Sequence, residues 1–174
     1  MISEGGNAMQ RIACWAAAFV AIAGVAHAAD ELVPPPQGAS LLLEVAADGV
    51  QVYVCEAKDQ GFTWTFKAPE ANLFDKQGLQ VGTHFAGPTW KIGDGAVIGE
   101  VAARADAPAG GAIPWLLLRA KRNEGSGVLS TVAFIRRVDT KGGIAPASGC
   151  DAAHSGAQAR VRYYAAYQFF GAAK

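Results

Sequence analysis

The sequence predicts one all-β domain, an antiparallel β-sandwich or barrel of about eight or nine strands, preceded by a signal-peptide helix. Short apolar or alternating segments recur at near-regular spacing, and Gly, Pro and Asp residues separate them. After the first 28 residues, no segment sustains the period of an amphipathic helix. No internal repeat is strong enough to indicate a propeller.

The first 28 residues have the pattern of a bacterial-type secretory signal. Arg11 precedes an apolar run over 12–25, which ends in the small-residue motif Ala-His-Ala before Ala29. This run is too short to span a bilayer as a mature helix. We therefore expect a mature chain that begins near Ala29, in the periplasm or outside the cell. Met9 is an alternative start, and a buried N-terminal helix is the alternative structure.

Charge and size limit the classes of partner. The mature chain of about 146 residues is one domain with room for an apolar core. The sequence has 15 basic and 15 acidic residues, so its net charge is zero. A neutral protein has no long-range field to attract nucleic acid or an anionic membrane. We expect no nucleic-acid partner and no membrane span after the signal, whereas the oligomeric state stays open.

The cysteines favour one disulfide. Cys14 leaves with the signal, and it lacks the sequence that would make it a lipid anchor, so Cys55 and Cys150 remain. Two cysteines in an oxidising compartment usually pair, which predicts a Cys55–Cys150 bridge. Two buried free thiols are the alternative.

The first half of the domain is divided by turn residues. An extended, proline-rich lead-in over 29–40 precedes the β domain, 41–174. The Asp48-Gly49 pair predicts a turn, and 69–74 is compatible with a single helical turn. Strands are predicted at 41–46, 50–56 and 62–67.

Strict alternation over 62–67 predicts a half-buried strand that points Trp64 into the core, in phase with Phe62 and Phe66.

In the second half, a loop rich in Gly, Ala and Ser, 139–159, joins the last two strands. Strands are predicted at 79–85, 89–92, 96–101, 113–120, 128–138 and 161–170, with a hairpin between the second and third of these.

Alternation along the last strand predicts which residues are buried. Tyr163 and Tyr167 are expected in the core, because they share a face with Val161 and Phe169. Trp115 is expected in the core for a different reason, since it follows Ile113-Pro114 and precedes a leucine run. The opposite face mixes polar and aromatic residues and is a possible binding surface: Arg162, Tyr164, Gln168 and Phe170.

Four arginines on the two final strands have two interpretations. If the strands are neighbours, Arg136, Arg137, Arg160 and Arg162 form an anion-binding patch. They are equally well explained as solvated strand edges that oppose aggregation.

Several stretches, in order, resemble the DUF3455 family of uncharacterised secreted domains from bacteria and fungi. They are DGVQVYVC (48–55), WTFKAPEA (64–71), GTHFAGPTW (82–90), IPWLLL (113–118), TKGGIAP (140–146) and the tyrosine-rich 163–170. The resemblance covers nearly all of the mature chain and implies no assigned function. Some fungal relatives carry a malate dehydrogenase label. This sequence does not support that label, because it has neither a dinucleotide-binding glycine motif nor βαβ alternation.

Known catalytic motifs are missing from the sequence. There is no Gly-x-Ser-x-Gly elbow, and the mature chain has only two histidines, His84 and His154, with no zinc-type spacing. We expect no metal and no cofactor. A pair of carboxylates suited to glycoside hydrolysis stays open, because any two acids can meet in a fold.

The segment 82–90 is the one dense polar and aromatic cluster. Its glycines and proline can fix a loop that presents His84 and Trp90, with Lys91 beside them, to a small molecule or glycan. That hypothesis requires one exposed face of the Trp90 indole. In the alternative, Trp90 begins a core strand and His84 hydrogen-bonds to a backbone carbonyl.

The sequence favours a secreted or periplasmic, non-enzymatic domain that binds a small molecule or glycan or serves in the envelope. One alternative is a small secreted hydrolase that uses carboxylates or His84. Another is a structural envelope protein without a specific ligand. A deep cleft with converging acids favours the hydrolase, and an aromatic-lined groove favours binding.

Overall fold

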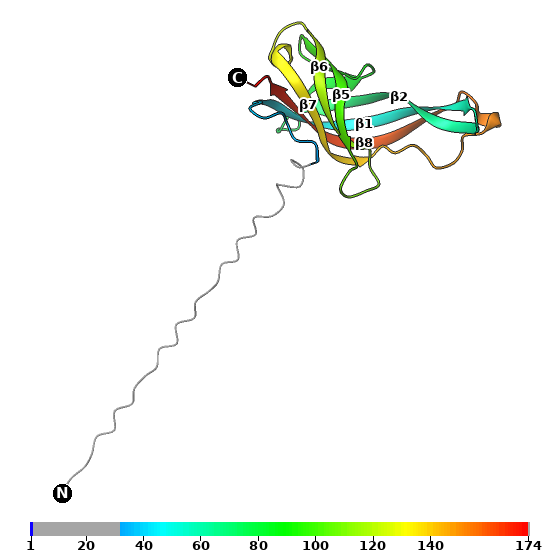
Figure 1. Ribbon diagram of the computed structural model, residues 1–174, viewed down its shortest axis with the longest axis horizontal. Helices are drawn as coiled ribbons and strands as arrows, with labels where there is room; N and C mark the ends of the chain where they lie inside the picture. Colours follow the sequence, from blue (N-terminus) through cyan, green and yellow to red (C-terminus); the bar gives the residue numbers. More distant parts are fainter. Residues whose placement is uncertain (2–31, 174) are drawn as a thin grey trace.

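Eight antiparallel strands form a closed barrel in the computed structural model, which describes residue 1 and residues 32–173 (Figure 1). The predicted signal segment lies outside the described residues. The sheet closes because β1 pairs with both β2 and β8. The all-β prediction is confirmed, in its barrel form. The strands are β1 (Leu41–Lys58), β2 (Gly61–Phe74), β3 (Gln80–Phe85), β4 (Thr89–Ile92), β5 (Gly95–Ala105), β6 (Trp115–Glu124), β7 (Val132–Gly142) and β8 (Gln158–Gly171).

The turn expected at Asp48-Gly49 is wrong, because β1 continues through both residues. Gly49 lies opposite Ala71 of β2 and Tyr163 of β8. A Cβ atom at Gly49 would collide with the Glu70 carbonyl oxygen and with Ala71. The glycine therefore allows two strands to approach closely, which is a common role for glycine inside a sheet.

Two further expectations about local structure are corrected. Residues 69–74 are part of β2 and not a helical turn, since they pair with β1. The expected strand 128–138 begins with a 3-10 helix, η1 (Val128–Thr131), before β7. Leu129 of η1 is completely buried in the barrel core, at the end of the barrel where β6 finishes and β7 begins.

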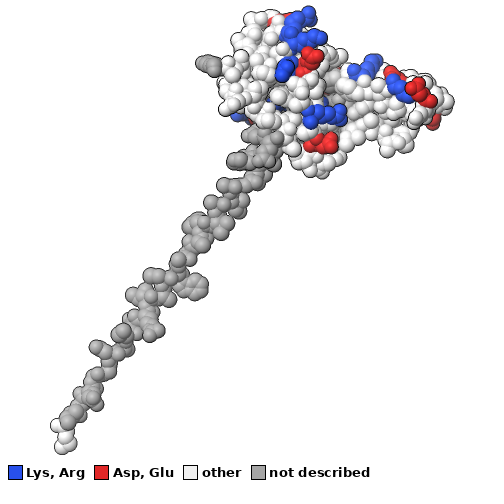
Figure 2. Space-filling model, in the orientation of Figure 1, with Lys and Arg blue, Asp and Glu red and all other residues white. Residues whose placement is uncertain are grey.

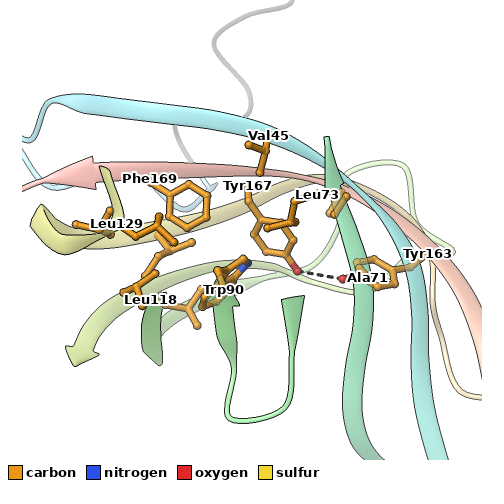
Figure 3. Close-up of a cluster of buried hydrophobic side chains, with 14 of the residues drawn as sticks. Val45, Ala71, Leu73, Trp90, Leu118, Leu129, Tyr163, Tyr167 and Phe169 are labelled. Atoms are coloured by element: carbon orange, nitrogen blue, oxygen red, sulfur yellow. Dashed lines mark hydrogen bonds between the residues drawn. The ribbon is translucent and has the colours of Figure 1, made fainter. Parts of the chain in front are cut away.

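Inward-facing side chains fill the barrel (Figure 3). Tyr163, Tyr167 and Phe169 are buried as the alternation predicted, and the two tyrosine hydroxyl oxygens are 3.4 Å apart. Phe170 is also buried, contrary to its expected place on the mixed face. The extra residue at the nearby register shift belongs to β7, between Val132 and Phe134, so β8 keeps its alternation and both of its faces are covered at this point.

A smaller apolar cluster lies beside the main core. Trp115 is buried in it, which confirms that it is a core residue. Val33, from the lead-in before β1, is completely buried against the same cluster, together with Ala107 and Val138. Val33 thus anchors the lead-in to the barrel.

Residues 53–58 of β1 and 61–66 of β2 extend past the barrel as a twisted ribbon, here named the arm (Figure 1). The expectation that Trp64 is a core residue is wrong: Trp64 is only half-buried, and Phe66 is 51% exposed. The β1–β2 register shifts between Val52 and Tyr53, where the arm begins. Alternation continues along the arm, but no barrel interior lies next to Trp64 and Phe66 to bury them.

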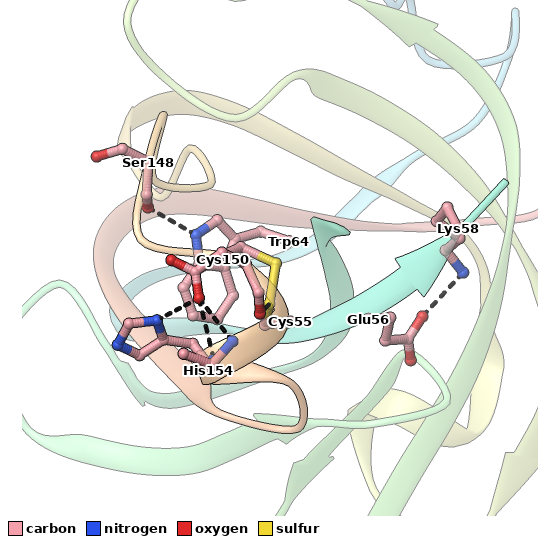
Figure 4. Close-up of a disulfide and its surroundings, with 9 residues drawn as sticks. Cys55, Glu56, Lys58, Trp64, Ser148, Cys150 and His154 are labelled. Carbon is pink, nitrogen blue, oxygen red and sulfur yellow. Dashed lines mark hydrogen bonds and ion pairs between the residues drawn. A yellow bond between two sulfur atoms is a disulfide. The ribbon is translucent and has the colours of Figure 1, made fainter. Parts of the chain in front are cut away.

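A disulfide between Cys55 and Cys150 joins the arm to the 143–157 segment, as predicted, with a Cα–Cα distance of 5.3 Å (Figure 4). The Trp64 indole donates a hydrogen bond to the Ser148 carbonyl oxygen at 2.9 Å, beside the disulfide. These contacts hold the 143–157 segment along one face of the arm.

Charges of both signs are interspersed on the face shown in Figure 2. Arg160 pairs with Glu70, and Arg162 pairs with Asp48, on the outside of the barrel. The four-arginine patch does not form, because Arg137 lines a cavity inside the barrel mouth. Within residues 32–173, no helix is long and apolar enough to cross a membrane.

Candidate functional site: a cavity at the barrel mouth

The structure brings together two of the three predicted site residues. His84 of β3 and Trp90 of β4 are direct cross-strand partners, and their rings stack with centroids 4.3 Å apart. Only 3% of His84 and 1% of Trp90 is exposed, so the expected exposed indole face is wrong. Lys91 lies one residue further along β4 and is exposed. Successive side chains of a strand point to opposite faces, so Lys91 is directed away from this pair.

His84 is held in one neutral form. Its Nδ1 atom is 2.9 Å from the Thr89 carbonyl oxygen, which can only accept a hydrogen bond. Nδ1 therefore carries the proton, as in the alternative interpretation of this segment. Burial, with a smaller contribution from the nearby Arg137 charge, lowers the pKa of His84 to about 3 against the opposing effect of the Thr89 hydrogen bond. A histidine whose pKa lies this far below 7 is a poor general acid or base near neutral pH.

The buried His84 predicts a stability that depends on pH. An unfolded histidine binds a proton below about pH 6.5, whereas folded His84 stays neutral. The stabilisation is therefore complete above about pH 6.5 and is lost as the pH falls toward 3. We expect the free energy of unfolding to fall by about 2 kcal/mol from His84 alone between about pH 7.5 and 5, measured by urea denaturation.

The matched variants His84→Gln and His154→Gln test this assignment. The first should flatten the pH dependence over that interval, even if it lowers stability at every pH. The second should keep the dependence, because His84 is still present. Equal slopes in wild type and His84→Gln would contradict the assignment.

A cavity of about 650 Å³ opens at the end of the barrel opposite η1, and it is here named the mouth cavity. Its inner part is formed by buried barrel residues, including His84, Trp90 and Tyr167, and its outer part by exposed residues such as Phe66 and Val101. The aromatic side chains of the arm extend along its outer part. The lining residues are Gln51, Tyr53, Trp64, Phe66, Lys67, Pro69, His84, Gly87, Pro88, Trp90, Val101, Arg104, Ile113, Pro114, Leu116, Leu118, Arg137 and Tyr167.

Two buried donors in the cavity lining have no hydrogen-bond partner among the described residues. They are the side-chain amide nitrogen Nε2 of Gln51 and the indole nitrogen Nε1 of Trp90. Gln51 is only 2% exposed. Buried polar groups in native proteins are almost always hydrogen-bonded, and exceptions require a structural or functional explanation. A ligand that brings hydrogen-bond acceptors into the cavity would supply such an explanation.

Arg137 places a positive charge in the same cavity. On β7 it lies opposite Tyr167 of β8 and Leu116 of β6, and all three line the cavity. Its Nε and Nη2 atoms donate to the Pro114 carbonyl oxygen at 3.0 and 2.8 Å. Burial raises the pKa of Tyr53 and of Tyr167, and the charge of Arg137 acts against that rise. A hydrogen bond between Arg137 and the Tyr167 side chain also opposes the rise in the pKa of Tyr167.

Sequence reasoning missed three polar residues of this site. Gln51 and Tyr53 lie on the face of their strand opposite the valines, a pattern that is visible in the sequence. Because valine is the more apolar residue, local alternation favours burial of the valine face and gives no signal for the other one. Both faces are covered at this point, since Val52 and Tyr53 are each buried, and the Tyr53 hydroxyl donates to the Gly143 carbonyl oxygen at 2.6 Å. The sequence groups Arg137 with three other arginines on the two final strands and does not place it in a cavity. Strand alternation separates it from Arg136, but only the closed barrel shows which of the two faces inward.

No aspartate or glutamate lines the mouth cavity, so the paired carboxylates of a glycosidase have no place in it. In the part of the chain that the structure describes, no group of three or more His, Cys, Asp or Glu residues could hold a metal ion. The cavity offers hydrogen-bond donors, a positive charge and aromatic surface.

Comparison with known families agrees with the motifs in the sequence. Residues 35–171 match the model of a family described as "Protein of unknown function (DUF3455)". No curated protein and no solved structure matches the chain significantly. The match extends from the lead-in to the last residue of β8, so it includes every strand of the barrel. The chain therefore belongs to the DUF3455 family.

Proposed function

We propose that this protein is a secreted or periplasmic binding protein that holds a small organic molecule in the mouth cavity without transforming it. One observation carries the proposal: two buried donors, Gln51 Nε2 and Trp90 Nε1, lack partners in the lining of a cavity of about 650 Å³. Small-molecule sites are typically concave and largely apolar, with a few polar groups that fix orientation.

The shape of the site favours a compact ligand over a glycan chain. Its inner aromatic residues, Trp90 and Tyr167, are almost completely buried, whereas Phe66 at the entrance is exposed. A ligand that reaches the unpartnered donors must therefore occupy the buried inner part of the cavity. An extended polysaccharide on the outer surface would leave those donors unsatisfied.

Secretion rests on the N-terminal sequence pattern and agrees with the disulfide. Cys55 and Cys150 are bonded, and such bonds persist mainly in oxidising compartments. A protein outside the cytoplasm has no ready supply of nucleotide cofactors, which suits binding more than cofactor-dependent chemistry.

Filling the cavity tests the proposed function. Leu116 lines the cavity and is partly buried, so Leu116→Trp should occupy ligand space. Nile red, a neutral dye that fluoresces in apolar sites, should bind the wild type with saturation at one dye per chain. Leu116→Trp should weaken that binding at least about tenfold, a loss of about 1.4 kcal/mol.

Leu42→Trp is the control, because Leu42 is an exposed leucine of β1 outside the cavity. It should bind Nile red like the wild type. Circular dichroism confirms that both variants are folded. Dye binding that does not saturate, or that Leu116→Trp leaves unchanged, would contradict a ligand site in the mouth cavity and favour a purely structural role.

A further inference from the structure

We propose that the ligand of the mouth cavity is an organic anion, a carboxylate carried on an apolar body. This inference rests on the proposed function and specifies its ligand class. Three features support it: the sign of the charges in the lining, the N–H groups of Arg137 that its protein partners leave unused, and the kind of polar atom left without a partner.

The charged residues of the lining are all cations. Lys67, Arg104 and Arg137 come from three different strands, β2, β5 and β7, and no acid accompanies them. Arg104 lies opposite Leu116, so both belong to the face that lines the cavity. Lys67 occupies the register shift between β1 and β2, at the base of the arm. Cations converge on the cavity although the whole chain is neutral.

These cations differ from the arginines on the outer surface. Arg122, Arg160 and Arg162 each form an ion pair with a nearby carboxylate. Among the described residues, no carboxylate forms an ion pair with Arg137. A partly buried charge without a counter-ion is costly, so its retention in a cavity points to an anion supplied from outside.

Arg137 keeps donors available for such an anion. A guanidinium has five N–H groups in a planar fork, which matches the two oxygens of a carboxylate. The bonds to the Pro114 carbonyl oxygen use Nε and Nη2 and fix the plane of the fork. A further hydrogen bond joins Arg137 to the Tyr167 side chain, and the N–H groups left over can donate to an anion. The side chain is already oriented by these contacts, which lowers the entropic cost of binding.

The unpartnered atoms require acceptors from the ligand. Gln51 Nε2 and Trp90 Nε1 are both donors, so a group with only donors cannot satisfy them. Carboxylate oxygens accept hydrogen bonds at several positions. The rest of the lining is mainly apolar, with Ile113, Leu116 and Phe66 as examples, and fits a hydrocarbon or aromatic body.

Decanoate and decanol test the inference, because they share a chain and differ in charge. Each competes with bound Nile red, and the concentration for half displacement is measured. A merely apolar cavity prefers decanol, which partitions more readily from water. We expect decanoate to displace the dye at a concentration at least about tenfold lower, since a hydrogen bond to a charged group contributes that much.

Arg137→Gln should abolish the preference for decanoate, whereas Arg119→Gln, on an exposed arginine outside the cavity, should keep it. If Arg137→Gln fails to fold, the double variant Lys67→Gln/Arg104→Gln replaces two exposed cations and should reduce the preference several-fold. Nile red binding with equal or better displacement by decanol would overturn the anion inference and leave the cavity as a neutral site. No saturable Nile red binding would overturn the proposed function itself.

Discussion

Replacing Trp90 by alanine should lower the free energy of unfolding by about 3 to 5 kcal/mol, the usual cost of removing a buried tryptophan. The indole stacks on His84 and meets the rings of Tyr167 and Phe169 edge-on, with centroids 5.3 and 6.1 Å away. On its other side, a Cβ at Gly99 would lie 3.1 Å from the indole Cζ3 atom, so the glycine makes room for the ring. Truncation to alanine would remove all of these contacts and leave a void beside the rings.

Urea denaturation measures this loss, and Lys91→Ala is the control. Lys91 is the next residue on the same strand and is exposed, so its truncation should change stability by less than about 0.5 kcal/mol. If Trp90→Ala unfolds the chain completely, Trp90→Phe should give a smaller, measurable loss. A cost for Trp90→Ala as small as that for Lys91→Ala would mean that the indole is not part of the core.

The local sequence is sufficient to predict structure where the contacting residues are close together in the chain. The hairpin between β4 and β5 was predicted, because a short glycine-containing loop follows an alternating strand. In the structure Ile92 pairs with Gly95 across that turn. The pairing of His84 with Trp90 follows in the same way, since β3 and β4 are neighbours in sequence. Their burial agrees with the alternative interpretation of the 82–90 segment, in which Trp90 begins a core strand and His84 hydrogen-bonds to a backbone carbonyl.

Non-local pairing was not visible in the sequence. Whether the strands close into a barrel depends on β1 meeting β8, and their contact joins residues such as Val45 and Tyr167 from opposite ends of the domain. The same closure makes Arg137 face a cavity.

The arm shows the opposite error, a residue predicted to be in the core that the fold leaves outside it. There Trp64 keeps the alternation of a core strand, but its strand has left the barrel.

Glycine caused the error in β1 for a related reason. Asp48-Gly49 is a common turn pair, and local preference gives no way to tell a turn from a close strand approach. The deciding contact is with Glu70 and Ala71 of β2, more than twenty residues away in sequence. Tertiary packing therefore overrides the local preference at this position.

Removing the Cys55–Cys150 bridge should lower the free energy of unfolding by about 2 to 5 kcal/mol. The two cysteines are 95 residues apart, so the bridge closes a loop that includes most of the barrel. Closing a long loop restricts the unfolded chain most strongly, which is the main source of the stabilisation. Reduction should also loosen the arm, where Cys55 exchanges backbone hydrogen bonds with Gly156 and Ala157 at 2.9 Å.

The comparison that isolates the bridge is wild type against Cys55→Ala/Cys150→Ala, each with and without dithiothreitol. Reductant should lower the denaturation midpoint of the wild type and leave the double variant unchanged, because the variant has no bond to break. Hydrogen exchange should show the protection lost first in the 143–157 segment, which the bridge holds against the arm. Two reactive thiols in the native, secreted protein, or a wild-type midpoint that ignores the reductant, would show that the bridge is not a stabilising element.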